Sequence, residues 1–353
     1  MPQEPVTVRR LLLNLTLCFT LFFGVASAQD AAQPDPLFLD NTALAVTITA
    51  PLTTLVRERP KDDYLQGVFE YTGADGSAVK LDIEIRTRGH FRHANCDFPP
   101  LGLNFRKKQV SGTLFDQQNK LKLVVHCDNH VRFEQNVLRE YLAYRIHNSI
   151  TDLSYHVRLL RVTYVDSEGR RKDQVRYAYL IEHKNRLAAR LGLDVIERER
   201  IKVSSIQGDQ LNLTSVFQYL IGNTDFSPIA GAPGRGCCHN YVLFGNNVAP
   251  LLSIPYDFDQ SGFVDAPYAS PNAALSIRNV RQRLYRGRCV NNEHIDASIS
   301  MISDRQDEIL ALVEDQEGLD ARTQKKLLRY IDKYFDLVET PKKVKRYIIK
   351  KCV

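Results

Sequence analysis

Short apolar segments with alternating polarity recur through the first half of the chain, and this pattern constrains the fold more than any other feature. Turn residues separate the segments, as in the sequence Ala-Asp-Gly-Ser at 74–77. An alternation with period two places every second side chain on the same face of a β-strand. We therefore predict strands at 44–48, 67–72, 80–86, 101–105, 121–125, 159–165 and 175–181.

Helical spacing replaces this alternation in the second half of the chain. One helix, at 133–150 with Asn129 as its N-cap, already interrupts the β-rich part, because its apolar residues fall near helical spacing. Two short apolar runs, at 241–244 and 251–256, predict a β-hairpin. After Glu182 we predict helices at 184–191, 213–221, 298–315 and 321–337. This order of elements predicts an α+β protein.

Polar residues flank the predicted hairpin at one end. Asp225 and Asn240 precede its first strand, and Asp257 and Asp259 follow its second strand. A hairpin can therefore gather three or four oxygen ligands at that end. Hard oxygen ligands beside an acid suit Mg²⁺ held against phosphates, as in kinase-like phosphoryl transferases. Asp and Asn are also common at turns and strand ends, so a purely structural role is the alternative.

Ordered short motifs between residues 80 and 262 resemble the CotH-like kinase family, a group of secreted or surface-associated atypical protein kinases, and more distantly the HipA-like kinases. The motifs are Ile-Arg-Thr-Arg-Gly at 85–89, Leu-Lys-Leu-Val-Val at 121–125, Leu-Arg-Glu-Tyr-Leu-Ala at 138–143, Tyr-Leu-Ile-Glu at 179–182, Asn-Thr-Asp at 223–225, His-Asn at 239–240 and Tyr-Asp-Phe-Asp at 256–259. The resemblance implies a bilobed protein-kinase-like fold. Its β-rich N-terminal lobe with one helix would span 38–182, and its mainly helical C-terminal lobe 183–353.

The resemblance also implies roles for the residues around the hairpin. Asp225 matches the catalytic Asp that accepts the proton of the substrate hydroxyl. Asn240 and Asp257 match the Mg²⁺ ligands, and Asp259 is an auxiliary ligand. The implied cofactors are ATP and Mg²⁺, and the implied reaction transfers the γ-phosphoryl group of ATP to a hydroxyl acceptor on a protein or another molecule.

The nucleotide-binding Lys is the point at which the chain departs from this family. Glu140 matches the helix Glu that orients such a Lys, and Glu182 lies in the segment that matches the hinge. Relatives usually carry the Lys on the strand after Arg-Gly, where this chain has none. Lys122, Lys120 or Arg88 can substitute, and Lys122 is the first choice. The missing Lys supports an alternative, a catalytically inactive kinase-like scaffold in envelope or cell-surface assembly. An insertion at 227–238, which separates Asp225 from Asn240, is a second departure.

The N-terminus has the pattern of a secretion signal. Arg9 and Arg10 precede an apolar run at 11–25 and the sequence Ala-Ser-Ala at 26–28. We predict a signal peptide at 1–28 and a flexible leader at 29–37, and therefore an exported protein in the periplasm or the extracellular space. A formal net charge of +6 over 353 residues does not indicate nucleic acid as a partner. The basic segment at 342–351 can touch an anionic membrane surface, but a terminal helix explains it equally well.

Export affects the interpretation of the cysteines. Six remain after the signal, an even number in an oxidising compartment, which predicts three disulfides. Because adjacent cysteines rarely bond to each other, we expect Cys237 and Cys238 to pair with Cys289 and Cys352. Cys96 and Cys127 then form the third pair. Zinc held by these two and their neighbouring histidines is the alternative.

Two further segments allow two interpretations each. The sequence from Asp257 to Gly262 resembles the start of a calcium loop, but Tyr268 stands where an EF-hand has its bidentate Glu. Five arginines lie between Arg278 and Arg288. They can bind an acidic or phosphorylated partner through bidentate contacts, or they can be solvated side chains around a structural cysteine.

Overall fold

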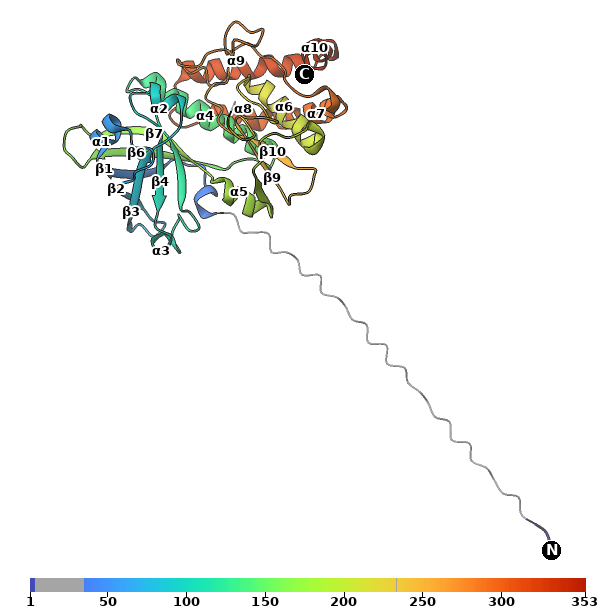
Figure 1. The fold of residues 1–353 in the computed structure, drawn as a ribbon, viewed down its shortest axis with the longest axis horizontal. Helices are drawn as coiled ribbons and strands as arrows, with labels where there is room; N and C mark the ends of the chain where they lie inside the picture. The colour runs from blue at the N-terminus through green and yellow to red at the C-terminus, as the bar shows by residue number, and fades with distance from the viewer. Residues whose placement is uncertain (4–34, 233) are drawn as a thin grey trace. The chain divides into compact units, whose positions relative to one another are not determined.

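Seven strands from the first half of the chain close into a β-barrel (Figure 1). The computed structural model describes residues 1–3, 35–232 and 234–353. Neighbouring strands in the order β1-β2-β3-β4-β5-β7-β6 pair antiparallel, and β1 closes the ring by pairing in parallel with β6. The strands are β1 (Leu44–Ala50), β2 (Leu65–Thr72), β3 (Ala78–Thr87), β4 (Leu101–Phe105), β5 (Lys120–Val124), β6 (Val157–Asp166) and β7 (Gln174–Ile181).

Alternation along these strands fills the barrel with apolar side chains. In β4, Leu101, Leu103 and Phe105 are buried while the residues between them are partly exposed. The Phe105 ring lies 5.4 Å from the ring of Phe69 on β2, centroid to centroid, in an edge-on arrangement. Such aromatic pairs add about 0.5–1.5 kcal/mol to the stabilisation from burial alone. The predicted strands are therefore present, and their apolar faces form one core.

The closed barrel shows that the expected bilobed kinase-like fold is wrong. All seven residues of β1 pair with β6, from Leu44 opposite Leu160 to Ala50 opposite Asp166. Alternation within a strand indicates which side chains share a face, but it does not indicate which distant strand is the partner. The parallel pairing of β1 with β6 removes the sheet edges, so the β-rich part is a barrel and not a lobe of the expected kind.

Helices and a small second sheet follow the barrel. The sheet has the order β10-β9-β8, with β8 at Asp194–Ile196, β9 at Tyr241–Gly245 and β10 at Leu252–Pro255. One helix, α4 (Val131–Ile150), lies between β5 and β6, and the others are α5 (Lys184–Leu191), α6 (Gly208–Ile221), α7 (Ile295–Ser303), α8 (Gln306–Glu314), α9 (Ala321–Val338) and α10 (Pro341–Tyr347). Short helices α1 (Leu52–Glu58), α2 (Phe91–Asn95) and α3 (Lys107–Val110) connect barrel strands. The described residues from 35 onward belong to one compact unit, and the expected boundary after residue 182 stays a prediction.

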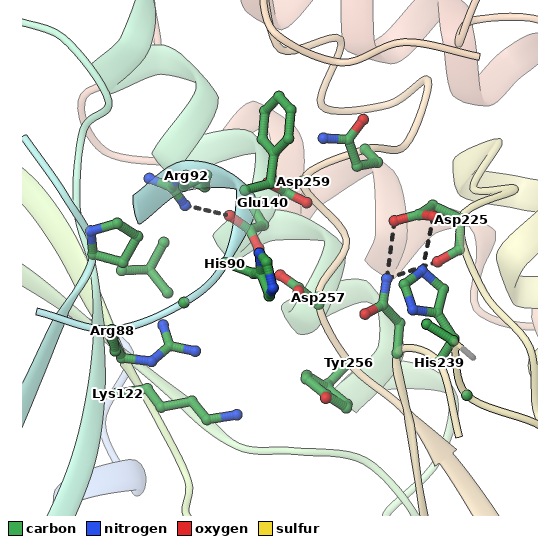
Figure 2. Close-up of a pocket in the computed structure, with 18 of the residues that line it drawn as sticks. Arg88, His90, Arg92, Lys122, Glu140, Asp225, His239, Tyr256, Asp257 and Asp259 are labelled. Carbon is green, nitrogen blue, oxygen red and sulfur yellow. Dashed lines mark hydrogen bonds and ion pairs between the residues drawn. The ribbon is translucent and has the colours of Figure 1, made fainter. Parts of the chain in front are cut away.

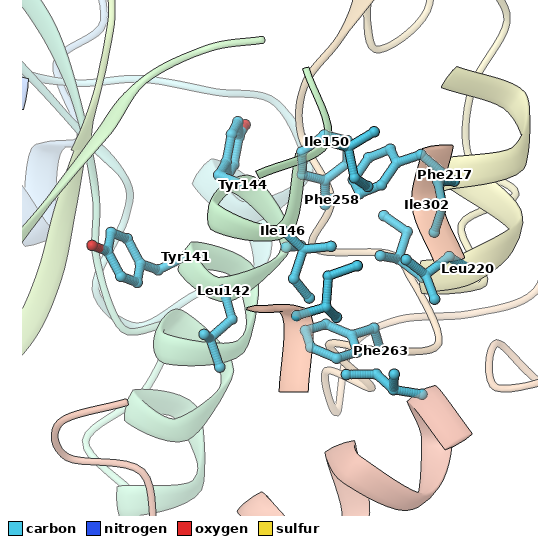
Figure 3. Close-up of a cluster of buried hydrophobic side chains, with 14 of the residues drawn as sticks. Tyr141, Leu142, Tyr144, Ile146, Ile150, Phe217, Leu220, Phe258, Phe263 and Ile302 are labelled. Atoms are coloured by element: carbon cyan, nitrogen blue, oxygen red, sulfur yellow. The ribbon is translucent and has the colours of Figure 1, made fainter. Parts of the chain in front are cut away.

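Helix α4 is buried on several sides because it packs between β7 and the other helices. Its Tyr144 lies 5.8 Å from Tyr179 of β7 and 4.6 Å from Phe258, measured between ring centroids. Figure 3 shows Phe217 and Leu220 of α6 beside Phe258 in the same cluster. Phe258 is fully buried. It therefore anchors the segment that carries Asp257 and Asp259.

Several predicted elements differ from the structure in detail. The helix predicted at 298–315 is two helices, α7 and α8, with a break at Asp304 and Arg305. The N-cap of α4 is His130 and not Asn129, because the His130 side chain accepts the Arg132 N–H at 3.2 Å. Four elements are absent from the sequence prediction, α1, α2, α3 and β8, which have between three and seven residues each. Segments this short carry too few residues to show a period.

The cysteines form three bonds, one of which matches the expected pairing. Cys96 bonds to Cys127, which confirms that pair and leaves neither thiol for zinc. Cys289 bonds to Cys352, and Cys237 bonds to Cys238, so the expected pairing of these four is wrong. The C-terminus returns beside Cys289, whose N–H donates to the Val353 carbonyl at 3.3 Å. This return places Cys352 beside Cys289. Both residues are distant in sequence from the adjacent cysteines, Cys237 and Cys238.

Apart from residues 1–3, the predicted signal peptide at 1–28 lies outside the described residues, as does most of the predicted leader at 29–37. Residues 35–37, at the end of the leader, are described, and they contact the rest of the protein. Asp35 forms an ion pair with Arg186, and Leu37 is fully buried in a 3-10 helix, η1 (Pro36–Phe38). Within the described part of the chain, no helix is both long and apolar enough to cross a membrane.

The bond between Cys289 and Cys352 gives a stability prediction. Replacing both residues by Ser should lower the free energy of unfolding by about 2–5 kcal/mol, because the bond restricts the unfolded chain over a sequence separation of 63 residues. Urea unfolding of the oxidised proteins measures the difference. A loss below about 0.5 kcal/mol, the size of an ordinary surface effect, would show that this bond does not stabilise the fold.

Candidate functional site

A cavity of about 1130 Å³ lies where the barrel meets the segments around α6 and the β9–β10 hairpin (Figure 2). Its walls come from the segment after β3, from β5 and α4, from the loop after α6, and from the residues that follow β10. The cavity contains Lys122, Glu140, Asp225, Asn240, Asp257 and Asp259 in its lining. These are the predicted site residues except Glu182, and they come from segments that are distant in sequence.

Glu182 is not part of this lining. Its side chain is buried, forms an ion pair with Arg190 at 3.0 Å and accepts the backbone N–H of His156 at 3.0 Å. These contacts join α5 to the start of β6. The structure therefore does not bring Glu182 to the other predicted site residues.

Asp225 lies in an irregular loop directly after α6. The helix ends at Gly222, whose φ of 62° is left-handed and where a Cβ atom would come within 2.0 Å of the Tyr330 hydroxyl. Asp225 Oδ1 lies 2.9 Å from His239 Nε2, and Oδ2 accepts the Asn240 Nδ2–H at 3.1 Å. The hydrogen bond to Asp225 raises the pKa of His239. Two neighbours thus orient the carboxylate, which is still partly exposed to the cavity.

The β9–β10 hairpin brings Asn240 and Asp257 together. The Tyr256 N–H donates to the Asn240 carbonyl at 3.0 Å, across the end of the hairpin. Both residues have left-handed backbones, with φ of 56° at Asn240 and 64° at Asp257, and Asn and Asp adopt this conformation more readily than most residues. The Asp257 N–H donates to the Tyr144 hydroxyl at 2.8 Å. The Asp257 side chain is exposed to the cavity.

Asn240 and Asp257 offer oxygen ligands that fit Mg²⁺. Asn240 Nδ2 donates to the backbone carbonyl and to the carboxylate of Asp225, so its amide oxygen is the end left for a cation. Among the described residues, no three His, Cys, Asp or Glu side chains are grouped to hold a metal ion. A cation here would therefore need ligands from water or a bound phosphate, which is the usual coordination of Mg²⁺.

Asp259 differs from Asp257 in its burial. Its side chain is buried, and burial together with the charge of Asp257 raises its pKa to about 7. Arg92 and the Tyr268 hydroxyl lie near it and favour the ionised form. Asp259 therefore fits an auxiliary role better than direct coordination.

Two cationic side chains line the wall of the cavity opposite Asp257. Figure 2 shows Arg88 and Lys122 pointing toward the side of Asp257 and Tyr256. The Lys122 Nζ lies 4.6 Å from the Tyr256 ring centroid. Burial and the charge of Arg88 lower the pKa of Lys122 to about 8. Over residues 35–232 and 234–353, neither side chain has a hydrogen-bond or ion-pair partner, so both are available to an anion.

Glu140 pairs with Arg92 and not with Lys122. The Arg92 Nη1 lies 3.7 Å from Glu140 Oε2, and both side chains are nearly buried. Burial and the charge of Asp259 raise the pKa of Glu140 to about 8. The expected ion pair between Glu140 and a nucleotide-binding Lys is therefore corrected to a pair with Arg92. Arg92 is not among the predicted site residues, because its contact with Glu140 depends on tertiary packing and not on a local sequence pattern.

The insertion at 227–238 folds back on itself and so brings His239 and Asn240 beside Asp225. Ser227 and His239 exchange two backbone hydrogen bonds, at 2.9 and 3.0 Å. The insertion also contributes to the cavity lining, through Gly231, Ala232, Arg235, Gly236 and Cys238. Its backbone pairing explains how Asp225 and Asn240 can be in contact across the insertion.

Comparisons with known proteins do not show a family for this chain. No family model matches it, and no curated protein matches it. Among solved structures, it is similar to the crystal structure of a Helicobacter pylori proinflammatory kinase, CtkA, with 11% sequence identity and a TM-score of 0.39. The match covers 71% of this chain and 90% of that chain. A similarity of this size establishes neither a common fold nor a common activity, and the CotH-like relationship is not shown.

Proposed function

We propose that the cavity binds Mg²⁺ with a nucleoside triphosphate, ATP in the first instance, and that the protein transfers the γ-phosphoryl group to a hydroxyl acceptor. One observation carries this proposal. The lining of the same cavity includes the cations Arg88 and Lys122, which have no hydrogen-bond or ion-pair partner among the described residues, and the oxygen ligands Asn240 and Asp257. Cations on one side and metal ligands on the other are what a metal-bound polyphosphate requires. The motifs that resemble CotH-like kinases support the same proposal.

The residues have separate tasks in this proposal. Arg88 and Lys122 bind phosphate oxygens, and Asn240 and Asp257 hold Mg²⁺, which neutralises phosphate charge when it is bound. The acceptor oxygen forms a bond to the γ-phosphorus, and the bond from that phosphorus to the β–γ bridging oxygen breaks. The diphosphate leaves with the electron pair, and the Asp225 carboxylate takes the hydroxyl proton.

The proposal extends to the location of the protein. Export to the periplasm or the extracellular space is expected from the N-terminal sequence, and the bonds of Cys96 with Cys127 and Cys289 with Cys352 support it. Disulfides persist in oxidising compartments and are rare in the cytosol. The acceptor would therefore be an exported or surface molecule with a free hydroxyl group.

A catalytically inactive scaffold is the second candidate. The pairing of Glu140 with Arg92 supports it, because kinases require the corresponding Glu to orient a Lys. A melting-temperature measurement with Mg²⁺-ATP and a transfer assay with γ-phosphate-labelled ATP distinguish the two candidates. Stabilisation by Mg²⁺-ATP together with labelled acceptor supports the phosphotransferase. Stabilisation without transfer to any acceptor in a broad panel favours the scaffold, and the absence of both rejects the nucleotide site.

The lowered pKa of Lys122 gives a pH prediction for this site. Lys122 is mostly protonated below pH 8 and loses its charge as the pH rises through its pKa of about 8. A phosphate favours the charged amine, so binding above that pH must take up a proton, and the affinity for Mg²⁺-ATP should fall by up to about tenfold per pH unit.

Lys122→Arg is the matched control for this pH dependence. The guanidinium stays protonated, so affinity should be nearly independent of pH between 8 and 9.5. Calorimetric titrations in buffers of different ionisation enthalpy measure both the affinity and the proton uptake. The same pH dependence in both proteins would show that Lys122 does not contact the phosphates.

A further inference from the structure

The backbone of the Asp225 loop is held by side chains. Its residues belong to no helix or strand, and Thr224 and Phe226 are buried, so their carbonyls need partners within the protein. Arg286 Nη1 donates to the Thr224 carbonyl at 2.5 Å and to the Phe226 carbonyl at 2.7 Å. Asn240 Nδ2 donates to the carbonyl between them, that of Asp225, at 2.7 Å. Three consecutive carbonyls thus accept hydrogen bonds from two side chains.

This arrangement fixes the backbone on both sides of Asp225. The Thr224 carbonyl belongs to the peptide plane before the Asp225 Cα, and the Asp225 carbonyl belongs to the plane after it. Arg286 holds the first plane and Asn240 holds the second. The Arg286 guanidinium also lies 5.0 Å from the Phe226 ring centroid. With both planes fixed, the direction of the Asp225 side chain depends on Arg286 as well as on His239 and Asn240.

Arg286 itself is held in place from the C-terminal end of the chain. The Val353 N–H donates to the Gly287 carbonyl at 2.9 Å, next to the bond between Cys289 and Cys352. Arg283, three residues earlier in the same irregular segment, donates to the carbonyls of Tyr219 and Leu220 at the end of α6 and to that of Tyr330 in α9. Two of the five clustered arginines therefore contact the backbone inside the protein, and do not extend toward an acidic partner.

We propose that Arg286 is a positioning residue that holds Asp225 in the orientation needed to accept the hydroxyl proton. The proposal rests on the phosphotransferase function proposed above. Arg286 does not line the cavity and touches no reacting atom. Its effect passes through the peptide groups beside Asp225, so its loss should slow the transfer step and leave the binding of Mg²⁺-ATP at Asp257 and Lys122 largely unchanged.

Three variants test this inference. Arg286→Met keeps the length of the side chain but removes its donors, and it should lower kcat by about 10–100-fold with KM for ATP changed by less than about threefold, since small misplacements of a catalytic group cost rate. Arg286→Lys keeps the positive charge and the N–H donors on a shorter side chain of different geometry, so it should be intermediate. Arg278→Met is the control, because the Arg278 side chain is exposed and, among the described residues, only its backbone N–H has a bond, to Gln282.

Hydrogen exchange of residues 223–227 provides a readout that does not need activity. The Asp225 N–H donates to Asn223 Oδ1 and the Ser227 N–H to the His239 carbonyl, so loosening the loop should make these amides exchange about tenfold faster or more. Arg286→Met should show this change, and Arg278→Met should not. Unchanged exchange in Arg286→Met would overturn the inference, and so would faster exchange with an unchanged kcat per folded molecule.

The same experiment separates this inference from the proposed function. If the wild-type protein transfers no phosphoryl group, the proposed function is wrong, and the exchange measurement alone decides whether Arg286 holds the Asp225 loop. If Arg286→Met does not fold, Arg286→Lys is compared with the wild type in its place, with the same criteria. Folded fractions are determined by circular dichroism before kcat is calculated, so a loss of folded protein is not counted as a loss of rate.

Discussion

Asp257→Asn is expected to weaken the binding of Mg²⁺-ATP by about 100-fold or more while the fold stays intact. The exposed carboxylate of Asp257 is one of the two proposed Mg²⁺ ligands, and replacing it by a neutral amide would remove its charge from the metal. Even residues that only support metal ligands cost 10–100-fold in affinity when changed. A 100-fold loss corresponds to about 2.8 kcal/mol of binding free energy. The rise in melting temperature with Mg²⁺-ATP should therefore be much smaller in the variant than in the wild type at the same nucleotide concentration.

The stability of this variant should change by less than about 0.5 kcal/mol. In the described part of the chain the Asp257 carboxylate makes no hydrogen bond, and only the backbone N–H is bonded, to Tyr144. Asn also tolerates the left-handed backbone found at this position. Asp63→Asn, at an exposed carboxylate outside the cavity, is the matched control and should bind nucleotide as the wild type does. Unchanged nucleotide stabilisation in Asp257→Asn would contradict the metal-ligand assignment.

The sequence predicted that Asp225, Asn240 and Asp257 lie close together because local signals were sufficient for it, whereas Lys122 and Glu140 were assigned through the resemblance. Asp225 follows a helix, and Asn240 and Asp257 flank the two strands of one hairpin, so short-range patterns placed them near each other. The strands of the barrel were predicted for the same reason. The closure of these strands into a barrel was not predicted. The pairing of β1 with β6 joins segments that are distant in sequence, and the sequence of neither strand indicates its partner.

The misses share a physical cause. Arg92 reaches Glu140 from α2, and Arg286 reaches the Asp225 loop from the other end of the chain, so both contacts depend on tertiary packing. A charged side chain that bonds buried carbonyls has the same sequence signature as a solvated one. Cys289 was paired with the wrong partner for a similar reason, since only the return of the C-terminus decides its neighbour. Glu182 was assigned through a motif, but its ion pair with Arg190 serves the packing of α5.

Asp225→Asn is expected to lower phosphoryl transfer by about 10²–10⁴-fold and to retain the binding of Mg²⁺-ATP. The range is the usual contribution of a positioned general base. The amide cannot take the hydroxyl proton, but it has nearly the same shape as the carboxylate. The carbonyl contacts of the loop come from Arg286 and Asn240, so they persist in the variant. Transfer of labelled phosphate and nucleotide-induced stabilisation are measured on the same preparations.

Comparing Asp225→Asn with Asp257→Asn distinguishes the roles of the two carboxylates. If Asp225 is the base, its variant loses transfer and keeps binding, whereas the Asp257 variant loses both. If Asp225 is instead a metal ligand, both variants lose binding, and the assignment of the base is wrong. His239, 2.9 Å from the Asp225 carboxylate, gives a further control, because His239→Gln leaves the carboxylate in place. Its kcat should therefore stay above that of Asp225→Asn, and an equal loss would mean that the two side chains act as one unit.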